Sequence, residues 1–423
     1  MFGSKLDKQS FRSDPYYEQT IRRMANMQSE NHIDLALEQL YPNMIRWRRH
    51  LHQYPELSFH ERVTASWIAE RLTEMGCAVR TGVGGHGLIA VIKGDKPGPV
   101  IALRADIDAL PIQDEKSCDY ASKVPNVMHA CGHDAHTAAL LAVASYYSSN
   151  RAAVSGERRL LFQPAEEVTP GGALPMIKDG ALDGADVVYG VHLWTPLDYG
   201  LVASKPGPFM AAADEFVIDI TGCGGHGGLP HQAIDAILIG SHLVQAAQSI
   251  VSRNVNPLHP AVVTIGSFQA GSTNNVIAER CRLKGTVRSF DEQTRRMIHE
   301  RLEMLVKHTC AMHGAEVHYD MRIGYPPVVN DKPEAERFFE VSRSLFGEQA
   351  VIHSEAITVA EDFSYYLQQV PGCFMFVGAG NEECGAVFSH HHAKFDIDER
   401  AMLRSARLLI GMAEDFSSKF SLA

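Results

Sequence analysis

The stretch Val100-Ile101-Ala102-Leu103-Arg104-Ala105-Asp106-Ile107-Asp108 joins a short apolar run to two carboxylates. A continuous apolar run of this length is typical of a parallel strand that is buried on both faces. In an open α/β sheet, ligands bind beyond the carboxyl ends of the strands. The stretch therefore predicts a buried strand that delivers carboxylates to a binding site.

Three further apolar runs lead to side chains that can bind a metal. Glu166 and Glu167 follow the first of these runs, His192 follows the second, and His391 comes after the third and a glycine-rich loop. The runs are residues 159–162, 186–191 and 374–377. Any one such residue is weak evidence, because a polar residue after a strand usually belongs to an ordinary loop. Four strand ends with metal-competent side chains predict a common site at one edge of a sheet.

A cluster of potential metal ligands lies between the runs at residues 100–103 and 159–162. The stretch Val127-Met128-His129-Ala130-Cys131-Gly132-His133-Asp134-Ala135-His136 contains three imidazoles, one thiol and one carboxylate. Cys131 and His133 can reach one transition metal if the backbone turns sharply at Gly132. The alternative is a histidine-rich surface loop. The metal-competent side chains at the neighbouring strand ends argue against this alternative.

Composition bounds the class of protein. At 423 residues the chain is longer than one hydrophobic core usually serves, which predicts two domains. A net charge of −11 without a long basic run argues against nucleic acid or an anionic membrane as the partner. The sequence has no 18-residue apolar span, its first residues have no apolar core of signal-peptide type, and its eight cysteines include no CxxC pair. We therefore expect a cytoplasmic globular protein that has neither disulfides nor a membrane partner.

The order of the predicted elements indicates an α/β fold with an insertion. Residues 33–210 and 328–423 alternate strands with helices, which predicts a catalytic domain with a mostly parallel sheet covered by helices. Residues 211–327 read as βαββαβ, the ferredoxin-like split unit, and predict a smaller inserted lid or dimerisation domain. Residues 1–32 are polar and predict a loosely attached N-terminal extension.

Several motifs occur in the order found in one enzyme family. They are Arg-Ala-Asp-Ile-Asp-Ala-Leu-Pro, His-Ala-Cys-Gly-His-Asp-Ala-His, Gln-Pro-Ala-Glu-Glu, Gly-Val-His-Leu-Trp and Gly-Gly-His-Gly-Gly-Leu-Pro-His. From about residue 41 to 415 the chain resembles the amidohydrolase branch of the aminoacylase and carboxypeptidase metallopeptidases, which includes hippurate hydrolases and plant indole-acetyl-amino-acid hydrolases. The resemblance implies a zinc-exopeptidase-like catalytic domain.

The resemblance also implies a site for two divalent metal ions. The ligands that it implies are Cys131, His133, Glu167, His192 and His391. Glu166 resembles the general base that activates the attacking water, and Asp108 resembles the carboxylate that orients a ligand. Asp106 stands where other branches carry a histidine ligand, and its role is open. The donor set suits zinc or manganese, and cobalt and nickel are also compatible with it.

In the inserted domain, the resemblance points to four more residues. His226 resembles the histidine that reaches an active site, often that of the partner subunit, and stabilises the oxyanion. Asn275 and Arg288 resemble residues that hold the substrate carboxylate, and His231 is a candidate pocket residue. The resemblance implies a homodimer or a homotetramer.

One motif departs from the family pattern. The last ligand motif usually reads His-x-Pro-x-Phe, whereas this chain reads His391-His392-Ala393-Lys394-Phe395, preceded by His390. The missing proline leaves the ligand open among three histidines, and the distance to Phe395 favours His391.

The expected function is hydrolysis of the amide bond of N-acyl amino acids by a metal-activated water. The alternatives are release of ammonia or an amine from an aromatic or unusual substrate at the same site, a hydrolase with Cys131 as nucleophile and His133 or His136 as base, and a non-catalytic protein that binds a ligand or metal. The thiol enzyme leaves the carboxylates and His391 without a role.

Overall fold

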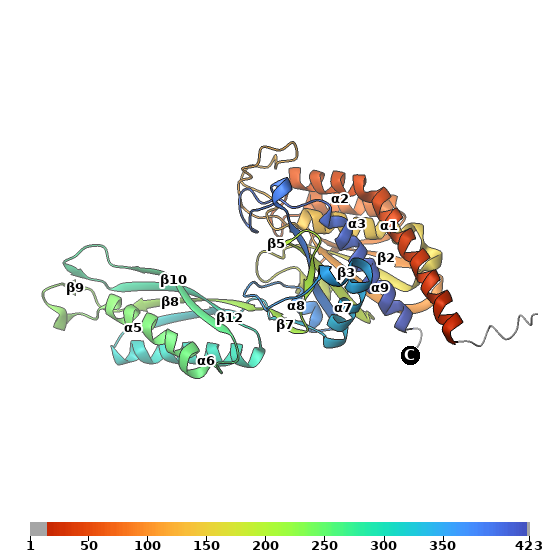
Figure 1. The fold of residues 1–423 in the computed structure, drawn as a ribbon. Coiled ribbons are helices and arrows are strands. Elements are labelled where there is room, and N and C mark those ends of the chain that lie inside the picture. The colour runs from red at the N-terminus through yellow and green to blue at the C-terminus, as the bar shows by residue number, and fades with distance from the viewer. Residues whose placement is uncertain (1–14, 421–423) are drawn as a thin grey trace, which may run out of the picture.

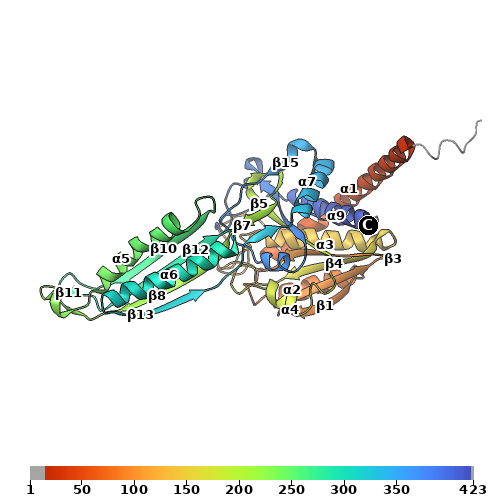
Figure 2. The same cartoon turned by 90° about the horizontal axis from the view of Figure 1, so that it is seen from below.

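The computed structural model describes residues 15–420, with side chains from residue 32 onward. The predicted N-terminal extension lies outside the described residues over positions 1–14, while positions 15–32 belong to helix α1, Pro15–Gln53. Figure 2 shows the N-terminal part of α1 extending beyond the rest of the molecule. Within residues 15–420, no helix has the length and apolar character needed to cross a membrane.

The larger part of the molecule is built on an eight-stranded sheet. Its strand order is β1-β2-β4-β3-β5-β16-β6-β15. The strands are β1 Ala78–Val83, β2 Gly87–Lys93, β3 Lys96–Asp106, β4 Ser155–Gln163, β5 Val187–Asp198, β6 Val202–Ser204, β15 Val351–His353 and β16 Gly372–Gly380. The central pairs β4–β3, β3–β5 and β5–β16 are parallel, as the continuous apolar runs predict.

The sheet has a hydrophobic core on each face. Because side chains alternate along a strand, Ile101 and Leu103 of β3 lie in one core while Ala102 lies in the other. In the core that contains Ile101 and Leu103, other helices surround α3, whose alanine-rich surface is buried on nearly all sides. The helices that supply these cores are α1, α2 Arg62–Glu74, α3 His133–Ser149, α4 Ala173–Lys178, α7 Lys332–Phe346, α8 Ser364–Leu367 and α9 Ala401–Phe420. Both layers are visible in Figure 1.

A second sheet unit projects from this body, as Figures 1 and 2 both show. Its antiparallel strand order is β10-β12-β8-β13, and α5 and α6 cover one face around a hydrophobic core of their own. The elements are β8 Ala212–Thr221, β9 Gly225–His226, α5 Ala236–Ser249, β10 Ala261–Ala270, β11 Val276–Ile277, β12 Arg280–Ser289, α6 Glu292–Met312 and β13 Glu316–Arg322. The predicted ferredoxin-like βαββαβ order is confirmed, whereas the domain bounds at 211 and 327 stay a prediction. A two-stranded antiparallel sheet of β7 Gly207–Met210 and β14 Val328–Asn330, the strands on either side of the inserted unit in sequence, lies where the two parts meet.

Some predicted boundaries are wrong. Helix α1 begins at Pro15, within the stretch 1–32 that was predicted as an N-terminal extension. Strand β5 continues past the predicted end at residue 191, because β16 goes on pairing with it through the partners Phe376 and His192. His192 therefore lies within a strand and not beyond its end. Helix α8 is short, Ser364–Leu367, and the side chains of Glu361 and Asp362 just before it accept hydrogen bonds from Arg104.

Candidate active site

The Cys131 stretch makes the sharp turn that metal binding requires. Gly132 has a φ of +98° and stands immediately before α3, so that His133 is the first residue of the helix. This left-handed conformation is one that glycine adopts without steric cost. The turn lets the Cys131 thiol and the His133 ring approach the same region, and with His192 they offer donor atoms within 4.8 Å of one another.

His133 presents one nitrogen for a metal. Its Nδ1 lies 3.1 Å from Oδ1 of Asp108 and 3.0 Å from the Asp108 carbonyl oxygen, so this nitrogen carries the proton and donates. Its Nε2 is buried and has no hydrogen-bond partner among the described residues. Asp108 therefore orients the ring, which is the contact expected of a carboxylate behind a metal ligand.

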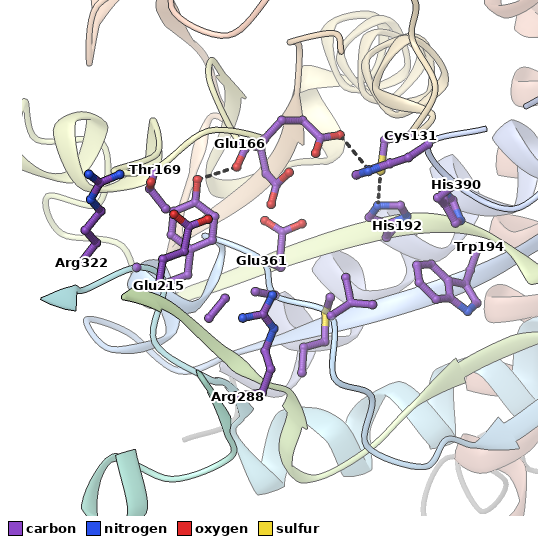
Figure 3. Close-up of a pocket in the computed structure, with 18 residues that line it drawn as sticks. Cys131, Glu166, Thr169, His192, Trp194, Glu215, Arg288, Arg322, Glu361 and His390 are labelled. Atoms are coloured by element: carbon purple, nitrogen blue, oxygen red, sulfur yellow. Dashed lines mark hydrogen bonds and ion pairs between the residues drawn. The ribbon is translucent and has the colours of Figure 1, made fainter. Parts of the chain in front are cut away.

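His192 is oriented in a similar way. Its Nδ1 donates to the Leu193 carbonyl oxygen at 2.8 Å, which leaves Nε2 facing the Cys131 sulfur at 3.4 Å. Figure 3 shows Cys131 and His192 together at one end of the pocket. The neutral imidazole is the form that binds a metal, and burial lowers the pKa of His192 well below its usual range.

Glu167 and His391 complete a second group of donors. The His391 Nε2 lies 3.4 Å from Oε1 of Glu167, and both residues have donor atoms within 4.8 Å of the Cys131 sulfur. The backbone of His391 has a φ of +65°, an unusual conformation for a residue with a side chain. Cys131 belongs to both groups, so the thiol stands between two candidate metal positions.

The donor atoms and their charges fit metal ions. Oε1 of Glu167 and Nε2 of His133 are buried without hydrogen-bond partners in the described chain, although such groups are nearly always satisfied in native proteins. Burial opposes a charge on His133, yet Asp106, Asp108 and Glu167 outweigh it and raise the pKa of His133 to about 10. The surroundings thus favour a cation, and a thiol with imidazoles and carboxylates is a set that zinc and manganese accept.

Glu166 lies beside the ligands but is directed into a pocket of about 440 Å³. Figure 3 shows its carboxylate facing that of Glu361 across the pocket. Burial and the nearby carboxylates of Glu361 and Glu167 raise the pKa of Glu166 well above its usual range. A buried carboxylate next to, but outside, the ligand set has the position of a general base.

Asp106 and His136 have other partners. Asp106 accepts hydrogen bonds from Nη1 of Arg104 at 2.7 Å and from Nδ1 of His136 at 2.7 Å. The Nε2 of His136 in turn accepts the Leu193 N–H at 2.9 Å. Both nitrogens of His136 are therefore occupied, and these residues hold β3, α3 and β5 together beneath the ligands.

The three neighbouring histidines have different surroundings. The His390 ring stacks on Trp194, with the ring centroids 4.6 Å apart, and its Nε2 accepts the Thr195 N–H. His392 stacks on Phe388. Only the middle residue, His391, belongs to a group of metal donors among the described residues. The geometry thus supports His391 as the metal ligand among the three histidines, as its distance from Phe395 in the sequence predicted.

Arg288 also reaches the pocket, from the end of β12. It is half-buried, and its guanidinium donates to the Thr286 hydroxyl and the Val287 carbonyl oxygen. Within the described residues it has no carboxylate partner at ion-pair distance. Figure 3 shows the guanidinium pointing toward Glu361, on the opposite side of that carboxylate from Glu166.

The other residues predicted in the inserted unit lie elsewhere. His226 is in β9 at the far end of the unit, where it lines an open groove together with Asn275 (Figure 1). His231 is exposed in the short helical turn Pro230–Gln232 next to β9. In one copy of the chain these residues and the pocket with Glu166 are at opposite ends of the unit.

Sequence reasoning missed the network behind Glu166. Arg104 is fully buried and donates to Glu361 at 2.9 Å and to Asp362 at 3.0 Å. Gln163 also donates to Asp362, at 2.8 Å. The available signal was Arg104 itself, because an arginine in a strand buried on both faces requires carboxylate partners. Nothing in the sequence shows that those partners lie more than 250 residues away.

Comparison with known proteins identifies the family to which this chain is similar. Residues 102–415 match the family model described as peptidase family M20/M25/M40. The protein YhaA of Bacillus subtilis (strain 168) is 50% identical over 384 residues, which cover 91% of this chain and 97% of that protein. The N-acyl-L-amino acid amidohydrolase of Geobacillus stearothermophilus is 47% identical over 302 residues, 71% of this chain and 82% of that protein.

Solved structures agree with the sequence relatives. The YXEP protein of Bacillus subtilis, described as a dinuclear metal binding peptidase from the M20 family, superposes with a TM-score of 0.78. It is 33% identical, and the match covers 90% of this chain and 99% of that protein. The fold that the sequence predicted is confirmed by this likeness.

Proposed function

The chain belongs to peptidase family M20/M25/M40 and is a metal-dependent hydrolase of amide bonds, and on this premise we propose that it cleaves N-acyl amino acids. Two divalent ions, manganese or zinc, would be held by Cys131, His133, Glu167, His192 and His391. When bound, the ions lower the pKa of a water molecule and polarise the scissile carbonyl group. The proposal gains support from relatives named for N-acyl amino acids and for N-acetyl-L-cysteine.

The protein's own residues would supply the proton transfer. Glu166 takes a proton from the attacking water and delivers it to the leaving nitrogen, as its place beside the ligands allows. Asp108 keeps the proton of His133 on Nδ1, so that Nε2 stays available as a ligand. Trp194, stacked between His390 and Phe376, forms an apolar wall at the metal end of the pocket.

The substrate class is inferred from the guanidinium of Arg288, which has no carboxylate partner among the described residues. A half-buried arginine without a carboxylate partner is costly unless a ligand supplies one. An N-acyl amino acid has a free carboxylate close to the scissile amide, and guanidinium groups bind carboxylates through two parallel hydrogen bonds. Arg288 would therefore hold the carboxylate of the amino acid.

Replacing Arg288 by methionine is expected to raise KM for N-acetyl amino acids by about 10- to 100-fold, the loss of one charged hydrogen bond. The corresponding N-acetyl amino acid amides lack the carboxylate and should be cleaved equally by both proteins. Arg322→Met is the matched control, because Arg322 lines the same pocket but is exposed and pairs with Asp320 at 2.9 Å.

The measurement is steady-state kinetics on N-acetyl, N-benzoyl and indole-acetyl amino acids, with protein reloaded with manganese or zinc. An equal rise in KM for acids and amides would contradict the role of Arg288. No turnover of any member of the panel by the wild-type protein would contradict the substrate class.

We further propose that His226 and Asn275 serve the active site of a second copy of the chain, in a homodimer or a homotetramer. Their groove is open and exposed, and its place at the far end of the inserted unit suits a contact with another subunit. There His226 would stabilise the oxyanion and Asn275 would bind the substrate, with His231 nearby as a candidate pocket residue.

Mixing two inactive variants tests this arrangement. The variants His226→Ala and Glu166→Gln, each nearly inactive alone, should recover about a quarter of the wild-type rate after joint refolding, because half of the dimers are mixed and each has one complete site. Activity that stays at the sum of the separate variants would place His226 outside the partner's site. Light scattering on the same samples gives the size of the assembly.

A further inference from the structure

The turn that carries Glu166 is strained. Ala165, the residue directly before Glu166, has a φ of +51°. This left-handed conformation is uncommon for any residue with a Cβ atom and persists only where neighbouring contacts hold it. The orientation of the base thus depends on contacts that fix residues 164–167.

Three of these contacts come from the larger part of the molecule. The Ala165 N–H donates to Oε1 of Glu61 at 2.8 Å, and the Ala165 carbonyl oxygen accepts the Gly172 N–H at 3.1 Å. The Glu167 N–H donates to Oδ2 of Asp108 at 3.0 Å. These bonds hold the residues on either side of Glu166. None of them binds the carbonyl oxygen of Glu166 itself.

That partner is the side chain of Tyr325, which follows β13 where the chain leaves the inserted unit. Its hydroxyl donates to the Glu166 carbonyl oxygen at 2.6 Å, the bond drawn as a dashed line beside the Glu166 label in Figure 3. The tyrosine is 6% exposed, and burial together with Asp362 and Glu166 raises its pKa well above the usual range. The hydroxyl therefore stays a donor at every working pH.

The backbone of Tyr325 is fixed to the inserted unit. Its carbonyl oxygen accepts the N–H of Ala213 at 3.1 Å, in β8, the strand by which the chain enters the unit. The preceding residue, Gly324, donates to the buried Asp214 at 2.9 Å and accepts from Arg295 of α6 at 2.9 Å. Tyr325 thus connects the base of the inserted unit with the Glu166 peptide.

We propose that Tyr325 is a positioning residue that couples the placement of the inserted unit to the orientation of Glu166. The inference rests on the role proposed for Glu166 as base. A shift of the unit about the Ala213–Tyr325 connection would move the hydroxyl and release the strained turn. Because small misplacements of a catalytic group lower rates strongly, this contact makes turnover depend on how the unit is seated.

Tyr325→Phe removes only the hydroxyl. We expect kcat to fall by about 10- to 100-fold while KM changes by less than about threefold and the bound metal stays unchanged. Tyr365→Phe is the matched control, since the Tyr365 ring packs against that of Tyr325 and its hydroxyl lies 3.5 Å from the Gly324 carbonyl oxygen without touching Glu166. The control should keep the wild-type kcat, and thermal unfolding of both variants shows that each is folded.

Amide hydrogen exchange of residues 161–168 tests the coupling without any substrate. Exchange in this segment should be at least about tenfold faster in Tyr325→Phe than in the wild-type protein or in Tyr365→Phe. Unchanged exchange in Tyr325→Phe would overturn the inference, even if kcat fell. Failure of the proposed function appears separately, as absence of turnover by the wild-type protein.

Discussion

Replacing Glu166 by glutamine is expected to lower kcat by about 10³- to 10⁴-fold, because the variant loses the group that accepts and returns the proton. Glutamine has the shape of a protonated glutamate, and burial already favours the protonated form in the metal-free protein. The fold and the two-metal content should therefore be preserved, and KM should change by less than about fivefold. Single-turnover kinetics and metal analysis of the same sample measure the two effects together.

The control for this variant is another glutamate of the same pocket. Glu215 lines the pocket from β8 and is exposed, so Glu215→Gln removes a negative charge without touching the candidate ligands. We expect its kcat to stay within about threefold of wild type. Normal turnover in Glu166→Gln would show that the base is a different group, whereas loss of metal from that variant would show that Glu166 is a ligand.

The parts of the site that could be predicted depend on residues that are close together in the sequence. The Cys131–His133 pair needs only a turn at one glycine, and Gly132 supplies it with a φ of +98°. Asp108 and Glu166 follow buried strands, so the rule that ligands bind beyond the carboxyl ends of strands brings them together. His192 reached the site for a different reason, since it lies inside β5 rather than beyond it.

The parts that could not be predicted depend on contacts between distant segments. Arg104 pairs with Glu361, and Tyr325 binds the peptide of Glu166 across 159 positions of sequence. Neither partner has a local pattern, because a buried ion pair or a side-chain bond to a carbonyl oxygen can use any residue that the fold brings near. The roles proposed for His226 and Asn275 need a second copy of the chain, and only the resemblance to the family pointed to them.

Replacing Cys131 by alanine is expected to remove both metals, from about two ions per chain to less than about half an ion, and to lower turnover by more than about 10³-fold. The reason is that Cys131 belongs both to the group with His133 and His192 and to the group with Glu167 and His391, so neither of these two groups stays complete without it. His133→Ala, which leaves the group of Cys131, Glu167 and His391 intact, should retain about one ion. Retention of two ions by Cys131→Ala would contradict its place as a ligand.

Loss of turnover in Cys131→Ala does not distinguish a metal ligand from a nucleophile, but chelation of the wild-type protein does. In the metal-free protein, burial and the Glu167 carboxylate raise the pKa of the Cys131 thiol well above its usual range, so the reactive thiolate is disfavoured. We expect chelation to lower turnover by more than about 10³-fold and manganese or zinc to restore it. Bound metal should also protect Cys131 from iodoacetamide in a protein whose exposed Cys223 and Cys384 are replaced by serine. Turnover that survives chelation and is lost on alkylation would instead make Cys131 the nucleophile.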